Sequence, residues 1–295
     1  MNKIILLLLT ALTHKSIAQT STEKPKILYG SCTKDSLIAE PFGKWFNPNY
    51  DSYTPNPATV AALRDQSTNN TRIRIFFGTW CGDSKREVPR FLKLLSAISF
   101  PAKNIELIAL GGGDSLVKQS PQHEEAGLGI FRVPTIIIYK NGLETNRINE
   151  FPVASLEKDL LAILAGHPYQ PNYRSFSSIA KWLKDETLLD ENLSARGLAE
   201  QLRPLVSDEH ELNSLGYLLM KQGKKKEALK IFQANYNLFP QSSNIASSLG
   251  EGYYENADFK KAISFLERAL ELNKDPQEVQ SILEILYKAK EKDKG

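Results

Sequence analysis

The sequence predicts an α/β sandwich, in which helices flank a mixed sheet, followed by an all-α domain of helical repeats. Two observations predict this fold class. Over residues 55–165, short β-branched and aromatic runs alternate with segments whose apolar residues recur at helical spacing. In the C-terminal third, a self-similar pattern returns after 34 residues. Two structural units also agree with a chain of 295 residues.

The first unit contains strands and helices in a regular order. The expected strands are compact apolar runs bounded by turn residues, at residues 72–77, 105–110, 135–139 and 143–148. The expected helices have apolar residues three and four positions apart, at residues 57–66, 84–98 and 153–165. Asn56 is a suitable N-cap, Pro89 should kink the second helix, and Asn141-Gly142 is a strong hairpin signal. This order favours a mixed sheet covered by helices.

The C-terminal repeat follows a linker at residues 166–176 that is rich in proline and aromatic residues. Leu215-Gly216 recurs as Leu249-Gly250, and Ala228 recurs as Ala262. This period and these small residues resemble the tetratricopeptide repeat, in which paired helices approach closely. The helical domain is expected at residues 177–290, with repeat units at about 209–242 and 243–276, a capping helix at 277–290 and a tail at 291–295. We expect these repeats to bind an unidentified protein ligand, with packing or dimerisation as an equal alternative.

The N-terminus has the pattern of an export signal. Lys3 precedes the apolar run Ile4–Leu9, and Ser16-Ile17-Ala18 provides a small-x-small cleavage site. The run is shorter than the about 20 residues that a transmembrane helix needs, so no membrane span is expected. We therefore assign residues 1–19 to a signal peptide and expect a periplasmic or extracellular protein. Residues 20–54 have weak periodicity and are expected to form an irregular lead-in that packs on the next domain.

Charge and histidine content exclude several classes of function. The formal net charge of +3 falls to +1 once residues 1–19 are removed, because Lys3 and Lys15 lie there and no acid does. This charge gives no case for nucleic-acid binding. The histidines are scattered and lack metal-ligand spacing, so neither a metal nor a cofactor is expected.

The segment Phe77–Lys85 (FGTWCGDSK) carries the candidate chemistry. It places Cys81 between a strand and a helix, where unpaired backbone N–H groups and the helix dipole favour a thiolate nucleophile. The segment resembles the Trp-Cys-x-x-Cys motif of the thioredoxin family. Pro89 matches the family's kinking proline, residues 129–135 resemble its cis-proline loop, and residues 139–142 resemble the following hairpin. The resemblance covers about residues 55–165 and implies a thioredoxin-like sandwich.

The resemblance also implies a role for each site residue. Cys81 would be the catalytic nucleophile, and Trp80 would shield its sulfur from one side. Val133 would pair its backbone with an incoming peptide, and Pro134 would shape the groove. The implied partners are cysteine-containing or extended client polypeptides.

Departures from the family motif leave the enzymatic status open. Ser84 replaces the second cysteine, so it could donate a hydrogen bond to the thiolate but could not form a disulfide within the motif. Ile75 replaces the family's buried aspartate, and Asp83 places a negative charge near the sulfur. Three alternatives remain: monothiol exchange or isomerisation at Cys81, a redox cycle with Cys32 as a distant resolving cysteine, or a non-catalytic peptide-binding or scaffold protein that keeps the fold.

Overall fold

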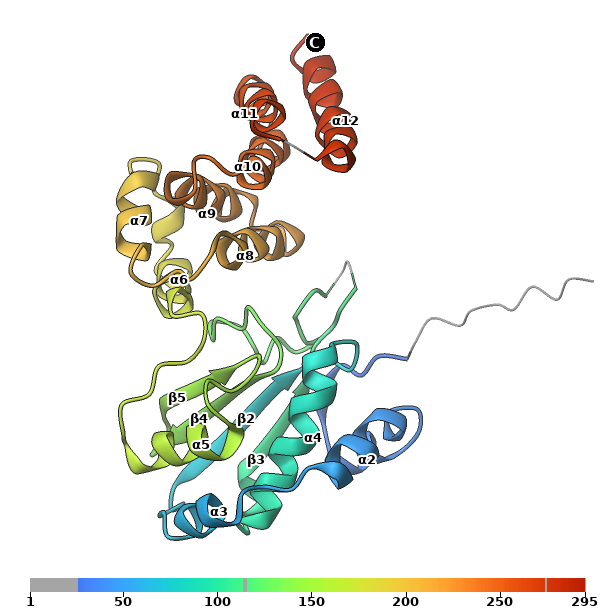
Figure 1. Ribbon diagram of the computed structural model, residues 1–295, viewed down its shortest axis with the longest axis vertical. Helices are drawn as coiled ribbons and strands as arrows, with labels where there is room; N and C mark the ends of the chain where they lie inside the picture. The colour runs from blue at the N-terminus through green and yellow to red at the C-terminus, as the bar shows by residue number, and fades with distance from the viewer. Residues whose placement is uncertain (1–25, 114–115, 274, 295) are drawn as a thin grey trace, which may run out of the picture.

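The computed structural model describes residues 26–113, 116–273 and 275–294. The predicted signal peptide, residues 1–19, lies outside the described residues. The described chain forms a sheet with flanking helices and, beside it, a stack of helices (Figure 1). The two parts meet where the segment between the third and fourth strands contacts the first helices of the stack.

The sheet has five strands in the order β1-β3-β2-β4-β5. Their bounds are β1 Gly30–Cys32, β2 Thr71–Phe77, β3 Ile105–Ala109, β4 Thr135–Lys140 and β5 Leu143–Asn149. The strands β2 and β3 are parallel and the other pairs are antiparallel, so the sheet is mixed. A parallel pair needs a crossover, which α4 (Gly82–Ala97) supplies. Between β4 and β5, Asn141 and Gly142 both have positive φ, as a two-residue hairpin turn requires.

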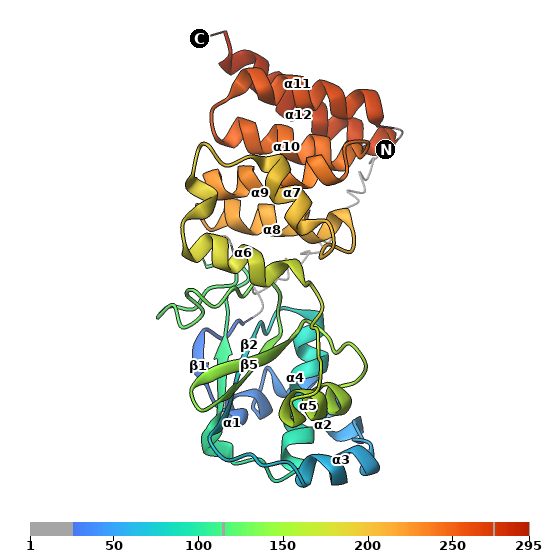
Figure 2. The same ribbon diagram turned by 90° about the vertical axis from the view of Figure 1, so that its left-hand side faces the viewer.

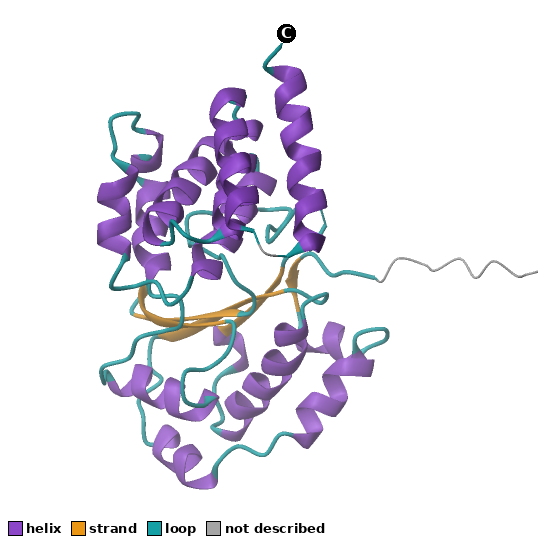
Figure 3. Ribbon diagram, turned by 45° about the horizontal axis from the view of Figure 1, so that its top comes forward, coloured by secondary structure: helices purple, strands orange, loops and turns teal. Residues whose placement is uncertain are grey.

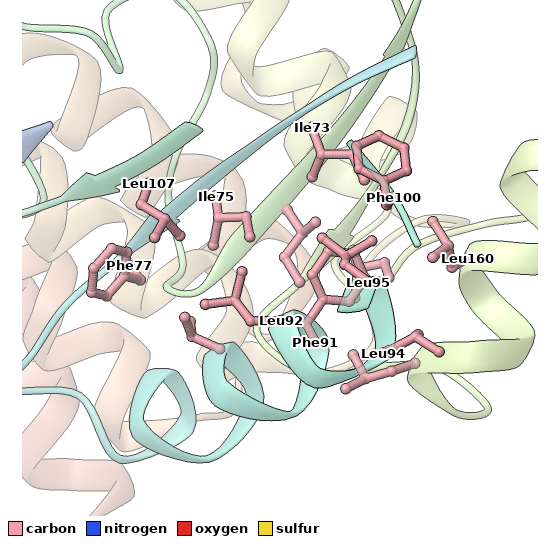
Figure 4. Close-up of a cluster of buried hydrophobic side chains, with 14 of the residues drawn as sticks. Ile73, Ile75, Phe77, Phe91, Leu92, Leu94, Leu95, Phe100, Leu107 and Leu160 are labelled. Carbon is pink, nitrogen blue, oxygen red and sulfur yellow. The ribbon is translucent and has the colours of Figure 1, made fainter. Parts of the chain in front are cut away.

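One face of the sheet carries the main core. Ile73, Ile75 and Phe77 alternate along β2 and point at α4, whose Phe91 and Leu95 are buried against them (Figure 4). The same face also packs against α3 (Pro57–Arg64) and α5 (Leu156–Ala165). Figure 3 shows these helices on one side of the sheet and the C-terminal helices on the other.

The prediction of an irregular lead-in was wrong for the described part of residues 20–54. This part contains β1, α1 (Lys34–Ile38) and α2 (Gly43–Ser52). Local sequence does not reveal these elements, because β1 has only three residues and α2 contains Pro48. Tertiary packing stabilises them instead: β1 pairs with β3, and Phe46 is buried in the core beside α4. The segment does pack on the sheet, as expected.

The C-terminal part is all helical and stacks helix upon helix (Figure 2). Its helices are α6 Ser175–Lys184, α7 Ala195–Leu202, α8 Glu209–Lys221, α9 Lys225–Leu238, α10 Ser243–Glu255, α11 Phe259–Leu272 and α12 Pro276–Lys292. Short 3₁₀ turns lie at Ala102–Asn104 and Thr187–Leu189. Successive pairs pack through small residues: a Cβ on Gly216 would overlap the Phe232 ring, and one on Gly250 would lie 2.7 Å from Leu266.

The segment before β4 contacts both parts of the molecule. Phe131 packs into the helical core, with its ring 5.1 Å from that of Phe176 in an edge-on geometry. Next to it, the Arg132 guanidinium donates to Ser214 Oγ on α8 at 2.6 Å. Val133 then turns back into the core of the sheet. This short segment therefore fixes the helical stack against the end of the sheet at which β4 and α4 begin.

Candidate functional site

Cys81 lies at the N-terminus of α4, at the end nearest the C-terminal helices (Figure 1). It is the N-cap residue, with extended backbone angles of φ −85° and ψ 131°. Its N–H donates to the Gly78 carbonyl at 3.0 Å, and its own carbonyl accepts from the Lys85 N–H at 3.0 Å. The half-buried sulfur therefore lies beside the free N–H groups of the first helical turn.

The cysteine sulfur contacts the loop that precedes β4. The thiol of Cys81 donates to the Val133 carbonyl at 3.2 Å, and the Val133–Pro134 peptide bond is cis. Proline has no N–H, so the backbone here presents acceptors but no donor at Pro134. The structure thus brings Cys81, Val133 and Pro134 together, although 52 positions separate the cysteine from Val133 in the chain.

Trp80 lies beside Cys81 and is held on three sides. Its indole N–H donates to the Leu110 carbonyl at 3.0 Å. Its ring packs between two glycines, because a Cβ on either Gly78 or Gly112 would lie 2.6 Å from it. Trp80 and Cys81 both pack against the apolar cluster on the face of the sheet away from α4. Gly78 and Gly112 therefore make room for this ring.

Replacing Gly112 with alanine is expected to displace the Trp80 ring, because the new Cβ would overlap it. Such overpacking typically costs about 1–3 kcal/mol of unfolding free energy. Urea denaturation measures the loss, and the indole N–H resonance of Trp80 reports the movement. Gly113→Ala is a matched control, since a Cβ there meets nothing within 4 Å. Equal stability and an unmoved Trp80 resonance in both variants would contradict the packing described here.

Ser84 has a different partner from the one expected. Its hydroxyl is fully buried and accepts a hydrogen bond from the Gly78 N–H at 3.1 Å. This bond ties the first turn of α4 to the end of β2 and so fixes the loop that carries Cys81. In the described structure, this is the hydrogen bond that Ser84 makes, and none joins it to Cys81. The expected role as a donor to the thiolate is therefore not seen in this state.

Cys32 is placed away from Cys81. It lies in β1 opposite Leu107 and packs against the core on the face that α4 covers. Cys81 packs against the cluster on the other face, and both cysteines are free. Burial raises the pKa of Cys32 to about 11, which disfavours the thiolate that an attack would need. The structure does not bring the two cysteines together, so it gives no geometric support for a resolving role.

The negative charge of Asp83 is paired. Its carboxylate binds the Arg86 guanidinium at 3.0 Å, and Arg86 also contacts the buried Glu87 at 2.5 Å. These two carboxylates, Glu87 first, raise the pKa of Arg86, so the guanidinium stays charged. Asp83, two residues after Cys81, therefore has a positive counter-charge in Arg86.

Lys118 is a candidate functional residue that the sequence analysis did not identify. It lies in the segment between β3 and β4, and its ammonium donates to the Phe131 carbonyl at 2.6 Å. Burial, reinforced by the charge of Arg132, lowers the pKa of Lys118 to about 8. No local motif marks this lysine, because its position depends on the path of a long irregular segment.

The tetratricopeptide repeat is found by comparison with known families. A family model described as "Tetratricopeptide repeat" matches residues 246–280. The match covers most of α10, all of α11 and the start of α12, and overlaps the second predicted unit. The C-terminal part contains this repeat, which is a unit of protein–protein interaction. No curated protein matches the chain.

The described residues show neither a metal cluster nor a membrane-spanning helix. Among them, no group of three or more histidine, cysteine, aspartate or glutamate side chains is arranged to hold a metal ion. Over the same parts of the chain, no helix has both the length and the apolar character needed to cross a membrane.

Proposed function

We propose that this chain is an exported thioredoxin-like protein that performs monothiol thiol–disulfide exchange with client polypeptides. One observation carries the proposal. The Cys81 sulfur lies at the start of α4 and 3.2 Å from the carbonyl of Val133, the residue before Pro134. A helix N-terminus favours a thiolate, and the backbone before a cis-proline suits the pairing of an extended peptide.

The proposed reaction exchanges one disulfide for another without net oxidation. The Cys81 thiolate attacks a sulfur of a client disulfide, which forms the Cys81–client bond and breaks the client's own S–S bond. The displaced client sulfur leaves as a thiolate and takes a proton from solvent. Because Ser84 offers no second sulfur, the mixed disulfide must be resolved by a thiol of the client or by a small thiol.

The repeats supply protein contacts for this reaction. The segment that carries Val133 also carries Phe131 and Arg132, which contact the helical stack. A client held at α8, in the first predicted repeat unit, would therefore lie near the site. Export rests on the apolar run that follows Lys3, and a periplasmic or extracellular location agrees with disulfide-bonded clients.

A non-catalytic peptide-binding or scaffold protein is the second candidate. It is favoured by the hydrogen bond between the Cys81 thiol and the Val133 carbonyl, which occupies the sulfur. It is also favoured by Ser84, whose buried hydroxyl is engaged with Gly78. In this alternative, the site binds an extended segment and makes no covalent bond.

Mixed-disulfide formation distinguishes the two candidates. We expect the folded protein to form a covalent adduct with an activated peptide disulfide at neutral pH, visible by intact mass. Cys81→Ala should abolish this adduct, whereas Cys32→Ala should retain it, because partial burial raises the pKa of Cys32 and disfavours its thiolate. An adduct that forms only after denaturation would reject thiol–disulfide exchange and would favour the non-catalytic peptide-binding function. The same mass measurement shows whether residues 1–19 have been removed.

A further inference from the structure

Lys118 and Cys81 contact the same short stretch of backbone. The Lys118 ammonium donates to the Phe131 carbonyl at 2.6 Å, and the Cys81 thiol donates to the Val133 carbonyl at 3.2 Å. The two acceptors are only two residues apart, just before β4. An ammonium and a sulfur that are 37 positions apart in the chain therefore both donate to the short segment before β4.

The charged groups around Lys118 come from several described elements. Arg132 and Glu150, which flank the β4–β5 hairpin, and Cys81, the N-cap of α4, are the charged or titratable groups that act on it electrostatically. Glu150 is engaged elsewhere, since it contacts Arg132 at 3.6 Å and accepts a hydrogen bond from the Tyr173 hydroxyl. Within the described residues, Lys118 forms no ion pair, although it is half-buried. Partial burial of a cation is costly, so the position of Lys118 calls for a functional reason.

The carbonyl beside Cys81 suits the thiol but not the thiolate. A carbonyl oxygen accepts a hydrogen bond from S–H, whereas it repels a negatively charged sulfur. Deprotonation therefore removes the contact with Val133 and creates a charge that needs a donor. Ile75 occupies the place of the family's buried aspartate, so no acid is available at that position.

We propose that Lys118 is the cationic partner of the Cys81 thiolate, a positioning residue that stabilises the nucleophile for the exchange proposed above. On ionisation, the thiol proton passes to water and the Lys118 ammonium keeps its own proton. The ammonium then balances the negative charge on Cys81. When the sulfur bonds to a client it becomes neutral, and the displaced client thiolate meets the same positive field.

The helical stack fixes the backbone next to Lys118. The side-chain amide of Gln222, at the C-terminal end of α8, donates to the Val117 carbonyl at 3.0 Å. The irregular segment is therefore attached to the helices on one side of Lys118 and to Phe131 on the other. This attachment explains how a long side chain outside any helix or strand can hold a defined place.

The pH dependence of alkylation tests the inference. Full-length protein with Cys32→Ala is treated with iodoacetamide across a range of pH, so that only Cys81 reacts. We expect Lys118→Met to raise the midpoint of the rate profile by about one pH unit, and so to slow labelling at pH 6 about ten-fold. Lys118→Arg should keep the profile by keeping the charge. Lys103→Met, which removes an exposed lysine from the opposite end of β3, should leave it unchanged. Superimposable profiles for wild type and Lys118→Met would overturn the proposal.

If Lys118→Met does not fold, a reciprocal measurement tests whether Lys118 is the cationic partner of the Cys81 thiolate. The coupling of two charges acts equally on both groups, so the thiolate must favour the Lys118 ammonium. NMR titration of the Lys118 side chain should give a lower midpoint in Cys81→Ala than in wild type, and equal midpoints would reject the partnership. Alkylation needs no client, so its outcome is separate from the proposed function. A shifted profile without client adducts rejects exchange alone, whereas adducts with an unshifted profile reject the role of Lys118 alone.

Discussion

Replacing Ser84 with cysteine is expected to shorten the lifetime of a mixed disulfide at Cys81 by about a hundred-fold or more. Cys81 is the N-cap of α4 and Ser84 lies three residues later in its first turn, so the new thiol would be a neighbour of the Cys81 sulfur. An intramolecular attack has a much higher effective concentration than a free thiol in solution. The new thiolate would attack the Cys81 sulfur, release the client as a thiolate and leave a disulfide between Cys81 and the introduced cysteine. Adduct decay followed by intact mass measures the change.

Ser84→Ala controls for the loss of the serine itself. It removes the acceptor for the buried Gly78 N–H, which costs about 1–3 kcal/mol of stability, without adding a thiol. Adduct lifetime should therefore stay near the wild-type value in Ser84→Ala. If the cysteine variant released its client no faster than the alanine variant, Ser84 would not occupy the resolving position.

The elements that could be predicted are those with strong local signals. The strand at 72–77 follows from a compact β-branched and aromatic run, and the helix at 84–98 follows from helical spacing. The structure has them as Thr71–Phe77 and Gly82–Ala97. The hairpin at Asn141-Gly142 follows from its turn residues. In these places local preference and tertiary packing agree, so the pattern alone is sufficient.

The elements that could not be predicted depend on distant parts of the chain. Helix α2 contains Pro48 and weak helix formers, and it is stabilised by the burial of Phe46 against α4. Lys118 lies in a segment without helical or strand periodicity, so its approach to Phe131 has no local signal. The partner of Ser84 also depends on how the loop from Gly78 turns back on the helix. Motif reasoning locates Cys81 but does not identify the charges around it.

The segment before β4 connects the repeats to the site. Phe131 lies in the core of the helical stack, and Val133, two residues later, lies in the core of the sheet. Between them, Arg132 contacts Ser214 on α8 and stacks on the Tyr173 ring at 4.9 Å. A shift of the helices would therefore move the carbonyl that accepts from Cys81. The contacts with α6 and α8 therefore connect the helical stack to the backbone beside Cys81.

Phe232→Ala is expected to cost about 3–5 kcal/mol of unfolding free energy in the helical part. The ring is fully buried and fills the space left by two glycines, since a Cβ on Gly216 would overlap it and one on Gly252 would lie 2.9 Å from it. It also packs edge-on against the Tyr217 ring, with centroids 5.1 Å apart. Neither glycine has a side chain that could fill the cavity, so little relaxation is expected. Urea denaturation followed by far-UV circular dichroism measures the loss.

Tyr287→Ala provides the matched aromatic control within the same helical part. Its ring is 63% exposed on the capping helix α12, so its removal should change stability by less than about 0.5 kcal/mol. A loss below about 1 kcal/mol for Phe232→Ala would show that the paired helices do not pack as described. If Phe232→Ala loses much stability in the helical part, the pH profile of Cys81 alkylation becomes informative. A wild-type profile would then show that the sheet holds Phe131 and Lys118 without the stack. Comparing the two readouts in one variant therefore tests whether the site depends on the repeats.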